Sequence, residues 1–117
     1  MMADTTDVLT WRETLHVSNE DAVPLVLFLE PWAEQFVIPA QSAVEIVAYG
    51  PDDGRLVIDK GDNQLVVWGW TGSSVHVLRN GHELAPEFLS AEQAAKIARR
   101  RTRPPVIRHE DRATDLG

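Results

Sequence analysis

The sequence contains no cysteine. Disulfides, thiol nucleophiles, iron–sulfur clusters and the thiolate ligand of a blue-copper centre are therefore excluded. The chain also lacks any apolar stretch near the ~18 residues that a membrane-spanning helix needs. Residues 1–7 have neither the cationic region nor the apolar segment of a secretory signal. We expect a soluble, cytoplasmic protein that contacts no membrane and is stabilised by packing alone.

Basic residues are scarce over most of the chain. Residues 1–88 contain four basic and fourteen acidic residues, whereas residues 89–117 contain seven basic and four acidic ones. An acidic surface does not favour phosphate binding, because phosphate contacts need clustered lysine and arginine. Contact with nucleic acid is therefore expected only of the C-terminal segment.

The strongest pattern is the segment V-P-L-V-L-F-L-E-P-W at residues 23–32. Five consecutive apolar residues, 25–29, predict a central strand covered on both faces. Pro31 ends this strand because proline offers no backbone donor. Asn80-Gly81 is the favoured dipeptide of a two-residue type I′ turn. Alternating segments between turn residues predict further strands at 8–18, 34–38, 43–49, 55–59, 64–70, 74–79 and 82–84.

The residue pattern changes after Pro86, from alternating strands to a helical segment. Ser90 and Gln93 form a capping box, which opens an alanine-rich helix that ends at the arginines before Pro104. With 117 residues the chain fits one domain. The predicted fold is mainly β, a single antiparallel β-sandwich of about seven or eight strands, cupredoxin-like or immunoglobulin-like, over residues 8–88. One C-terminal α-helix and an extended basic tail are expected over residues 89–117.

No catalytic or metal-binding constellation is evident. The histidines lie on different predicted elements and at no known ligand spacing: His16, His76, His82 and His109. No serine has the context of a nucleophile. Glu30 and Glu34 flank a bend as the acids of sugar-cleaving enzymes do, but Glu30 is better explained as an acceptor for donors that the broken strand leaves unpaired. We expect no metal, no cofactor and no enzymatic activity.

Tryptophans give the best sign of a binding surface. Trp68 and Trp70 share one face of the predicted strand 64–70, and Trp32 lies near a bend. Large aromatic residues in a small sheet protein usually fill the core, which is the favoured interpretation for at least two of the three. The alternative is an exposed platform for a sugar ring or a protein partner. Its candidate ligand-binding residues are Trp32, Trp68, Trp70 and Glu30.

The C-terminal segment gives a second candidate surface. An alanine stripe at helical spacing forms a small apolar face, and two adjacent β-branched residues beyond the helix are suited to adding to a sheet edge. The candidate partner-binding residues are Arg99, Arg100, Arg101, Arg103, Val106 and Ile107. The leading expectation is a non-enzymatic binding or assembly module that contacts a protein partner or itself. A carbohydrate or small-ligand binder is the first alternative, and nucleic-acid contact through the basic tail is the second.

Three sequence segments carry a resemblance to known proteins. V-S-N, P-L-V-L-F-L-E-P-W and I-P-A-Q-S, in this order along the predicted strands, resemble short bacterial β-sandwich proteins with a Glu30-Pro31-Trp32 motif and a layout similar to the cupredoxin fold. The resemblance covers roughly residues 9–84. Copper proteins of that fold use Cys, His and usually Met as ligands. This chain has no Cys and only terminal Met residues, so the resemblance implies the fold without electron transfer.

Overall fold

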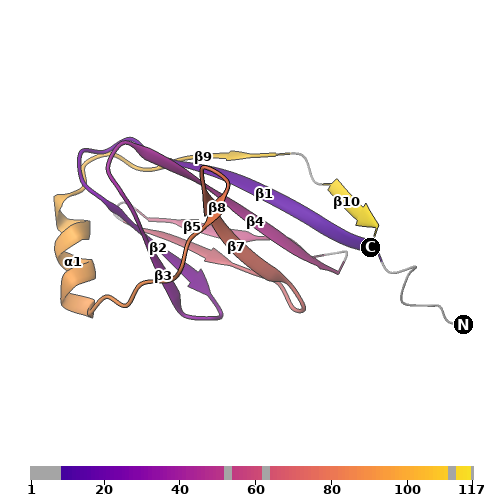
Figure 1. The fold of residues 1–117 in the computed structure, drawn as a ribbon. Helices are drawn as coiled ribbons and strands as arrows, with labels where there is room; N and C mark the ends of the chain where they lie inside the picture. The colour runs from indigo at the N-terminus through magenta and orange to yellow at the C-terminus, as the bar shows by residue number, and fades with distance from the viewer. Residues whose placement is uncertain (1–8, 52–53, 62–63, 111–112, 117) are drawn as a thin grey trace, which may run out of the picture.

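The computed structural model describes residues 9–51, 54–61, 64–110 and 113–116, which form two packed sheets and one helix (Figure 1). The protein is mainly β and is built as a sandwich with a C-terminal helix, as the sequence predicted. In chain order the elements are β1 (Leu9–Asn19), β2 (Leu25–Glu30), β3 (Glu34–Ile38), β4 (Ser42–Pro51), β5 (Val57–Lys60), β6 (Leu65–Trp68), β7 (Ser74–Arg79), β8 (His82–Glu83), α1 (Ala91–Arg100), β9 (Val106–His109) and β10 (Ala113–Leu116).

The strands divide between two sheets. Sheet A has the order β10-β1-β4-β7-β8, with β9 also paired to β1, and sheet B has the order β3-β2-β6-β5. The sequence predicted an antiparallel sandwich, and one pair differs, because β2 and β6 run parallel. Between these two strands the chain crosses to sheet A through β4 and returns as the β5–β6 hairpin, which brings β6 back in the direction of β2.

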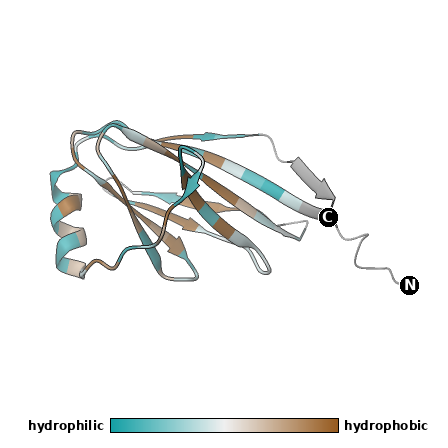
Figure 2. Cartoon of the chain, viewed as in Figure 1, coloured by the Kyte–Doolittle hydropathy of each residue, from teal (hydrophilic) through white to brown (hydrophobic). Residues whose placement is uncertain are grey.

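The core lies between the two sheets. In β2 alternate leucines point inward, and Val26 on the outer side is also buried, which confirms the prediction of a strand covered on both faces. Figure 2 shows that hydrophobic residues follow the strands of both sheets. The fully buried apolar side chains are Leu15, Val17, Leu25, Leu27, Leu29, Ile38, Ile46, Ala48, Leu65, Val67, Val77 and Pro105.

The local signals at turns and at the helix start are confirmed. Asn80 and Gly81 both have positive φ, 53° and 81°, as a type I′ turn requires. The Ser90 hydroxyl accepts a hydrogen bond from the Gln93 backbone N–H, and the Gln93 side chain accepts one from Ser90 N–H. Helix α1 contacts β2 of sheet B. Among the described residues, no helix has the length and apolar character to cross a membrane.

The segment expected as an extended tail belongs to sheet A. Strand β9 pairs antiparallel with β1, with Ile107 opposite Val17, and β10 pairs with β1 farther along. Strand β1 is longer than the strands of sheet B, and only β4 pairs with its other side. The free side of β1 offers unpaired backbone groups, which β9 and β10 satisfy. Strands β9 and β10, within the segment 89–117, therefore extend sheet A at the edge of β1.

Candidate functional site

The tryptophans do not form one platform. Trp68, the last residue of β6, points away from the core and is 44% exposed, whereas Trp70 packs against the core. A Cβ atom at Gly54 would lie 1.8 Å from the Trp70 ring, so only glycine fits there. The Trp70 indole Nε1 donates to the Pro51 carbonyl at 3.0 Å. The shared face expected for Trp68 and Trp70 is absent because β6 ends at Trp68.

Trp32 occupies a third environment. It is 42% exposed, and its ring lies so close to Gly69 that a Cβ atom there would be 2.5 Å away. It lines a cavity of about 200 Å³ together with Glu34, Ser73, Ser74 and Val75. Glu30 is the register partner of Trp68, and its carbonyl accepts the Gly69 N–H at 2.8 Å. The four candidate ligand-binding residues thus lie at one end of β2 and β6 but in different surroundings.

The outer face of sheet B has two halves. In the covered half, Val26 is 2% exposed, and the alanine stripe of α1 faces Phe28 across a cavity of about 330 Å³. In the bare half, Val57 and Trp68 are register partners, and Val57 is 60% exposed. Neighbouring strands present the side chains of register partners on the same face. An apolar surface therefore continues from beneath the helix into solvent.

Arg101 holds the end of α1 in place rather than facing a partner. It is 5% exposed. Its Nη1 donates to the Asn19 side-chain oxygen at 2.9 Å and to the carbonyls of Val23 and Pro24, and its Nη2 donates to the Arg103 carbonyl at 2.8 Å. A buried guanidinium needs such acceptors, because its donors have lost water. This candidate partner-binding residue is therefore part of the interior.

Asp21 completes the same cluster. Its Oδ2 accepts the backbone N–H groups of Thr102 at 2.6 Å and Arg103 at 2.8 Å, and its Oδ1 accepts that of Ala22. Hydrogen bonds from Arg103 and then Thr102 lower the pKa of Asp21 to about 2, and the charge of Arg101 acts in the same direction. Burial lowers the pKa of Arg101, which the negative charge of Asp21 opposes. The cluster fastens the segment after α1 to the turn between β1 and β2.

The remaining partner candidates differ in accessibility. Arg99, Arg100 and Arg103 are exposed near the end of α1. Val106 is 51% exposed on the outer face of sheet A, whereas Ile107 packs against the core. The structure therefore separates three accessible arginines from an edge strand that pairs within the molecule.

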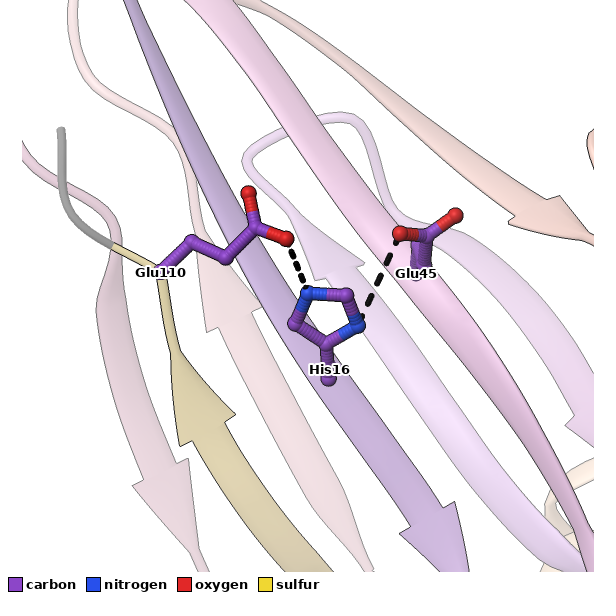
Figure 3. Close-up of polar contacts among 3 residues, drawn as sticks. All are labelled: His16, Glu45 and Glu110. Carbon is purple, nitrogen blue, oxygen red and sulfur yellow. Dashed lines mark hydrogen bonds and ion pairs between the residues drawn. The ribbon is translucent and has the colours of Figure 1, made fainter. Parts of the chain in front are cut away.

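His16 lies between two carboxylates on the outer face of sheet A (Figure 3). Its Nε2 is 2.5 Å from Glu110 Oε1, and its Nδ1 is 3.5 Å from Glu45 Oε2. The three residues each offer a ligand atom within 4.8 Å of the others. The sequence placed His16 in the predicted strand 8–18. It did not give the register that sets Glu45 opposite, nor the pairing of β9 that brings Glu110 near.

The other histidines have simpler surroundings. His76 Nδ1 lies 2.7 Å from Glu83 Oε2, and His109 Nδ1 lies 3.9 Å from the buried Glu13 carboxylate. His82 is exposed on the short strand β8. Within the described part of the chain, the group around His16 is the one in which three potential metal ligands converge.

No protein-family model matches the chain, and no curated protein or solved structure matches it either. The resemblance to short bacterial β-sandwich proteins therefore stays a prediction, and function has to be argued from the surfaces themselves.

Proposed function

We propose that the protein is a non-enzymatic binding module that contacts a protein partner through the bare half of sheet B and the adjoining helix α1. The observation that carries the proposal is the pair Val57 and Trp68, two large apolar side chains that are opposite each other and 60% and 44% exposed. Tryptophan is enriched at the centres of protein interfaces, where it supplies a large apolar area.

A further apolar group lies beside the same sheet. Phe88, in the loop before α1, is exposed. The loop runs along β3, because Glu87 N–H donates to the Gln35 carbonyl at 2.7 Å and Leu89 N–H donates to the Gln35 side chain at 3.2 Å. Exposed apolar side chains gathered around one sheet favour an interaction surface over a solvated one.

The helix contributes charge to this surface. Arg99 and Arg100 are exposed in its last turn. Glu30, opposite Trp68, adds an acidic group at the other end of β2. The complementary partner is therefore an apolar surface bordered by charges of both signs, since opposite charges at the rim of an interface raise the association rate. The surface differs from the tail that the sequence suggested, because β9 and β10 are engaged with β1.

Site-specific photo-crosslinking tests this proposal. A photoreactive residue replaces Val57 in one protein and Val106 in another, because both valines are exposed, by 60% and 51%, on opposite sheets. The partner that crosslinks in the native host is identified, purified and titrated against the unmodified chain. Trp68→Ser is expected to weaken this binding by tenfold or more, whereas Val106→Ser leaves it unchanged. A partner that crosslinks at 106 and is lost with Val106→Ser would refute the proposed surface and favour the edge of sheet A.

A second candidate is a small carbohydrate bound at Trp32. The indole borders a cavity of about 200 Å³ whose other polar groups are the Glu34 carboxylate and the hydroxyls of Ser73 and Ser74. Sugars stack on aromatic rings and bond to such groups. A panel of oligosaccharides is screened by tryptophan fluorescence with Trp32→Phe and Trp68→Phe as comparison variants. Binding that disappears only with Trp32→Phe favours the carbohydrate, and an unchanged spectrum with every sugar rejects it.

A further inference from the structure

We propose that His16, Glu45 and Glu110 bind one divalent transition-metal ion of the zinc type on the outer face of sheet A. This inference is independent of the partner surface on sheet B and departs from the sequence-based expectation of no metal. It rests on the convergence of three ligand-bearing side chains from three separate segments (Figure 3).

Strand pairing determines the backbone positions from which the three side chains project. His16 on β1 is the register partner of Glu45 on β4, so the two side chains project from the same face of neighbouring strands. On the other side of β1, Arg108 of β9 pairs with His16, and Glu110 follows two residues later. The Glu110 N–H donates to the Thr14 carbonyl at 2.9 Å. This hydrogen bond holds the third ligand beside β1.

The two carboxylates contact different ring nitrogens of His16, Glu110 at Nε2 and Glu45 at Nδ1, so binding one ion requires one carboxylate to rotate toward the nitrogen that the other already contacts. The three ligand atoms lie within 4.8 Å of one another. Zinc binds histidine nitrogen and carboxylate oxygen at ~2.0–2.2 Å, so two ligands of one ion are at most about 4.4 Å apart. Glu45 is partly exposed and Glu110 is exposed, which leaves both carboxylates room to close the difference.

The donor set selects the class of metal. One imidazole nitrogen and two carboxylate oxygens suit Zn²⁺ and its neighbours, whereas Ca²⁺ and Mg²⁺ prefer oxygen ligands alone. Three protein ligands also leave one tetrahedral position open. A cavity of about 460 Å³ borders His16 and Glu45 and leads to Asn80 and Arg108. Space in which water or a small anion fits therefore lies beside two of the three ligand residues.

One nearby charge opposes the metal. Arg108 lines the same cavity and lies directly opposite His16 in the register of β1 and β9. A cation at this position repels a bound divalent ion, because the two charges are close together and salt screens such short-range repulsion poorly. Removing its charge should therefore strengthen metal binding, an effect that a purely structural role of the cluster does not produce.

Calorimetric titration of the full chain with ZnCl₂ tests the site. We expect one ion per chain and a melting temperature that rises with zinc, because an ion that binds the folded state stabilises it. His16→Gln, Glu45→Gln and Glu110→Gln should each weaken binding by more than about tenfold, since loss of a residue that merely orients a ligand already costs about 10–100-fold. Arg108→Ala should strengthen it.

Matched controls come from the same face of the protein. His76 and Glu83 also form a histidine–carboxylate pair, at 2.7 Å, but without a third ligand, so His76→Gln and Glu83→Gln should leave zinc affinity unchanged. Circular dichroism establishes that each variant is folded. The proposal is overturned if zinc affinity survives His16→Gln, if the His76 variant loses it equally, or if Ca²⁺ binds as tightly as Zn²⁺ and depends on the glutamates alone.

Discussion

The outer faces of the two sheets differ in chemistry although their inner faces are alike. The outer face of sheet A contains histidine–carboxylate contacts at His16 and His76. The outer face of sheet B contains Val26 and Phe28 under the helix and Val57 and Trp68 beyond it. Charged groups in water need no cover, whereas apolar groups gain free energy when they are covered. The histidine–carboxylate pairs of sheet A therefore need no cover, and the apolar face of sheet B is covered by its helix only in part.

This contrast shows what the C-terminal segment does for the fold. Helix α1 contacts β2 but none of its residues is fully buried, so its own packing is weak. The polar cluster of Arg101, Asp21 and Asn19 fastens the chain where the helix ends. The cover over sheet B thus depends on hydrogen bonds beyond the helix as much as on the alanine stripe.

The largest effect is expected from Arg101→Ala. This change removes the donor shared by the Asn19 oxygen and the carbonyls of Val23 and Pro24. The Asn19 oxygen keeps the Asp21 N–H, and the Val23 carbonyl keeps the Asn19 amide, as their remaining donors. Removing one member of a buried charged network costs about 3 kcal/mol or more. The free energy of unfolding, measured in urea, should fall by this amount, and the covered half of sheet B should bind hydrophobic dyes.

Arg100→Ala is the matched control, because Arg100 is exposed one residue earlier. Exposed substitutions away from such networks usually stay within about 0.5 kcal/mol. Equal losses for the two arginine variants would contradict the role assigned to Arg101.

Two valines on the outer face of sheet B allow a direct comparison of the covered half with the bare half, with a smaller expected effect on stability than that of Arg101→Ala. Val26 in the covered half is 2% exposed, and Val57 in the bare half is 60% exposed. Val26→Ala should lower the free energy of unfolding by about 1.5–3 kcal/mol, through lost burial and the cavity left behind. Val57→Ala should cost less than about 0.5 kcal/mol. Similar values from urea unfolding would mean that the helix does not protect its half of the face in solution.

Lowering the pH should weaken the hydrogen bonds of Asp21 that fasten the end of the helix. The folded-state pKa of Asp21 is lowered to about 2, so its carboxylate stabilises the fold above the unfolded pKa of about 3.9. That contribution is lost as the pH falls through this interval, because the unfolded chain takes up the proton first. Unfolding free energies measured from pH 7 to pH 2.5 should decline less steeply for Asp21→Asn than for the unchanged chain. Parallel curves would exclude Asp21 as a source of the acid sensitivity.

The sequence predicted most of the elements because their signals are local. The run at residues 25–29 gave β2, Asn80-Gly81 gave a reversal between β7 and β8, and the capping box gave the first turn of α1. Each of these signals depends on a few neighbouring residues and their backbone preferences. Alternation over residues 8–18 likewise predicted the strand that the structure shows as β1.

What the sequence did not predict depends on contacts between distant segments. Arg101 looked like one of several surface arginines, because its acceptor Asn19 lies 82 residues away in the chain. The approach of Glu110 to His16 spans 94 residues. Trp70 was placed with Trp68 because strict alternation was continued past the end of β6. Pairing register and strand ends are set by tertiary packing, which periodicity does not encode.

The pairing of β1 with β9 and β10 also determines when the sandwich can be completed during synthesis. Strand β1 is made first among the described elements, yet Leu9 pairs with Leu116 and Ser18 with Val106. Closing a loop of about a hundred residues carries a large entropic cost, and contacts so distant in sequence slow folding. Until β9 and β10 have emerged from the ribosome, one edge of β1 stays open to other strands. This edge therefore stays exposed to edge-to-edge aggregation throughout the synthesis of β2 to β8.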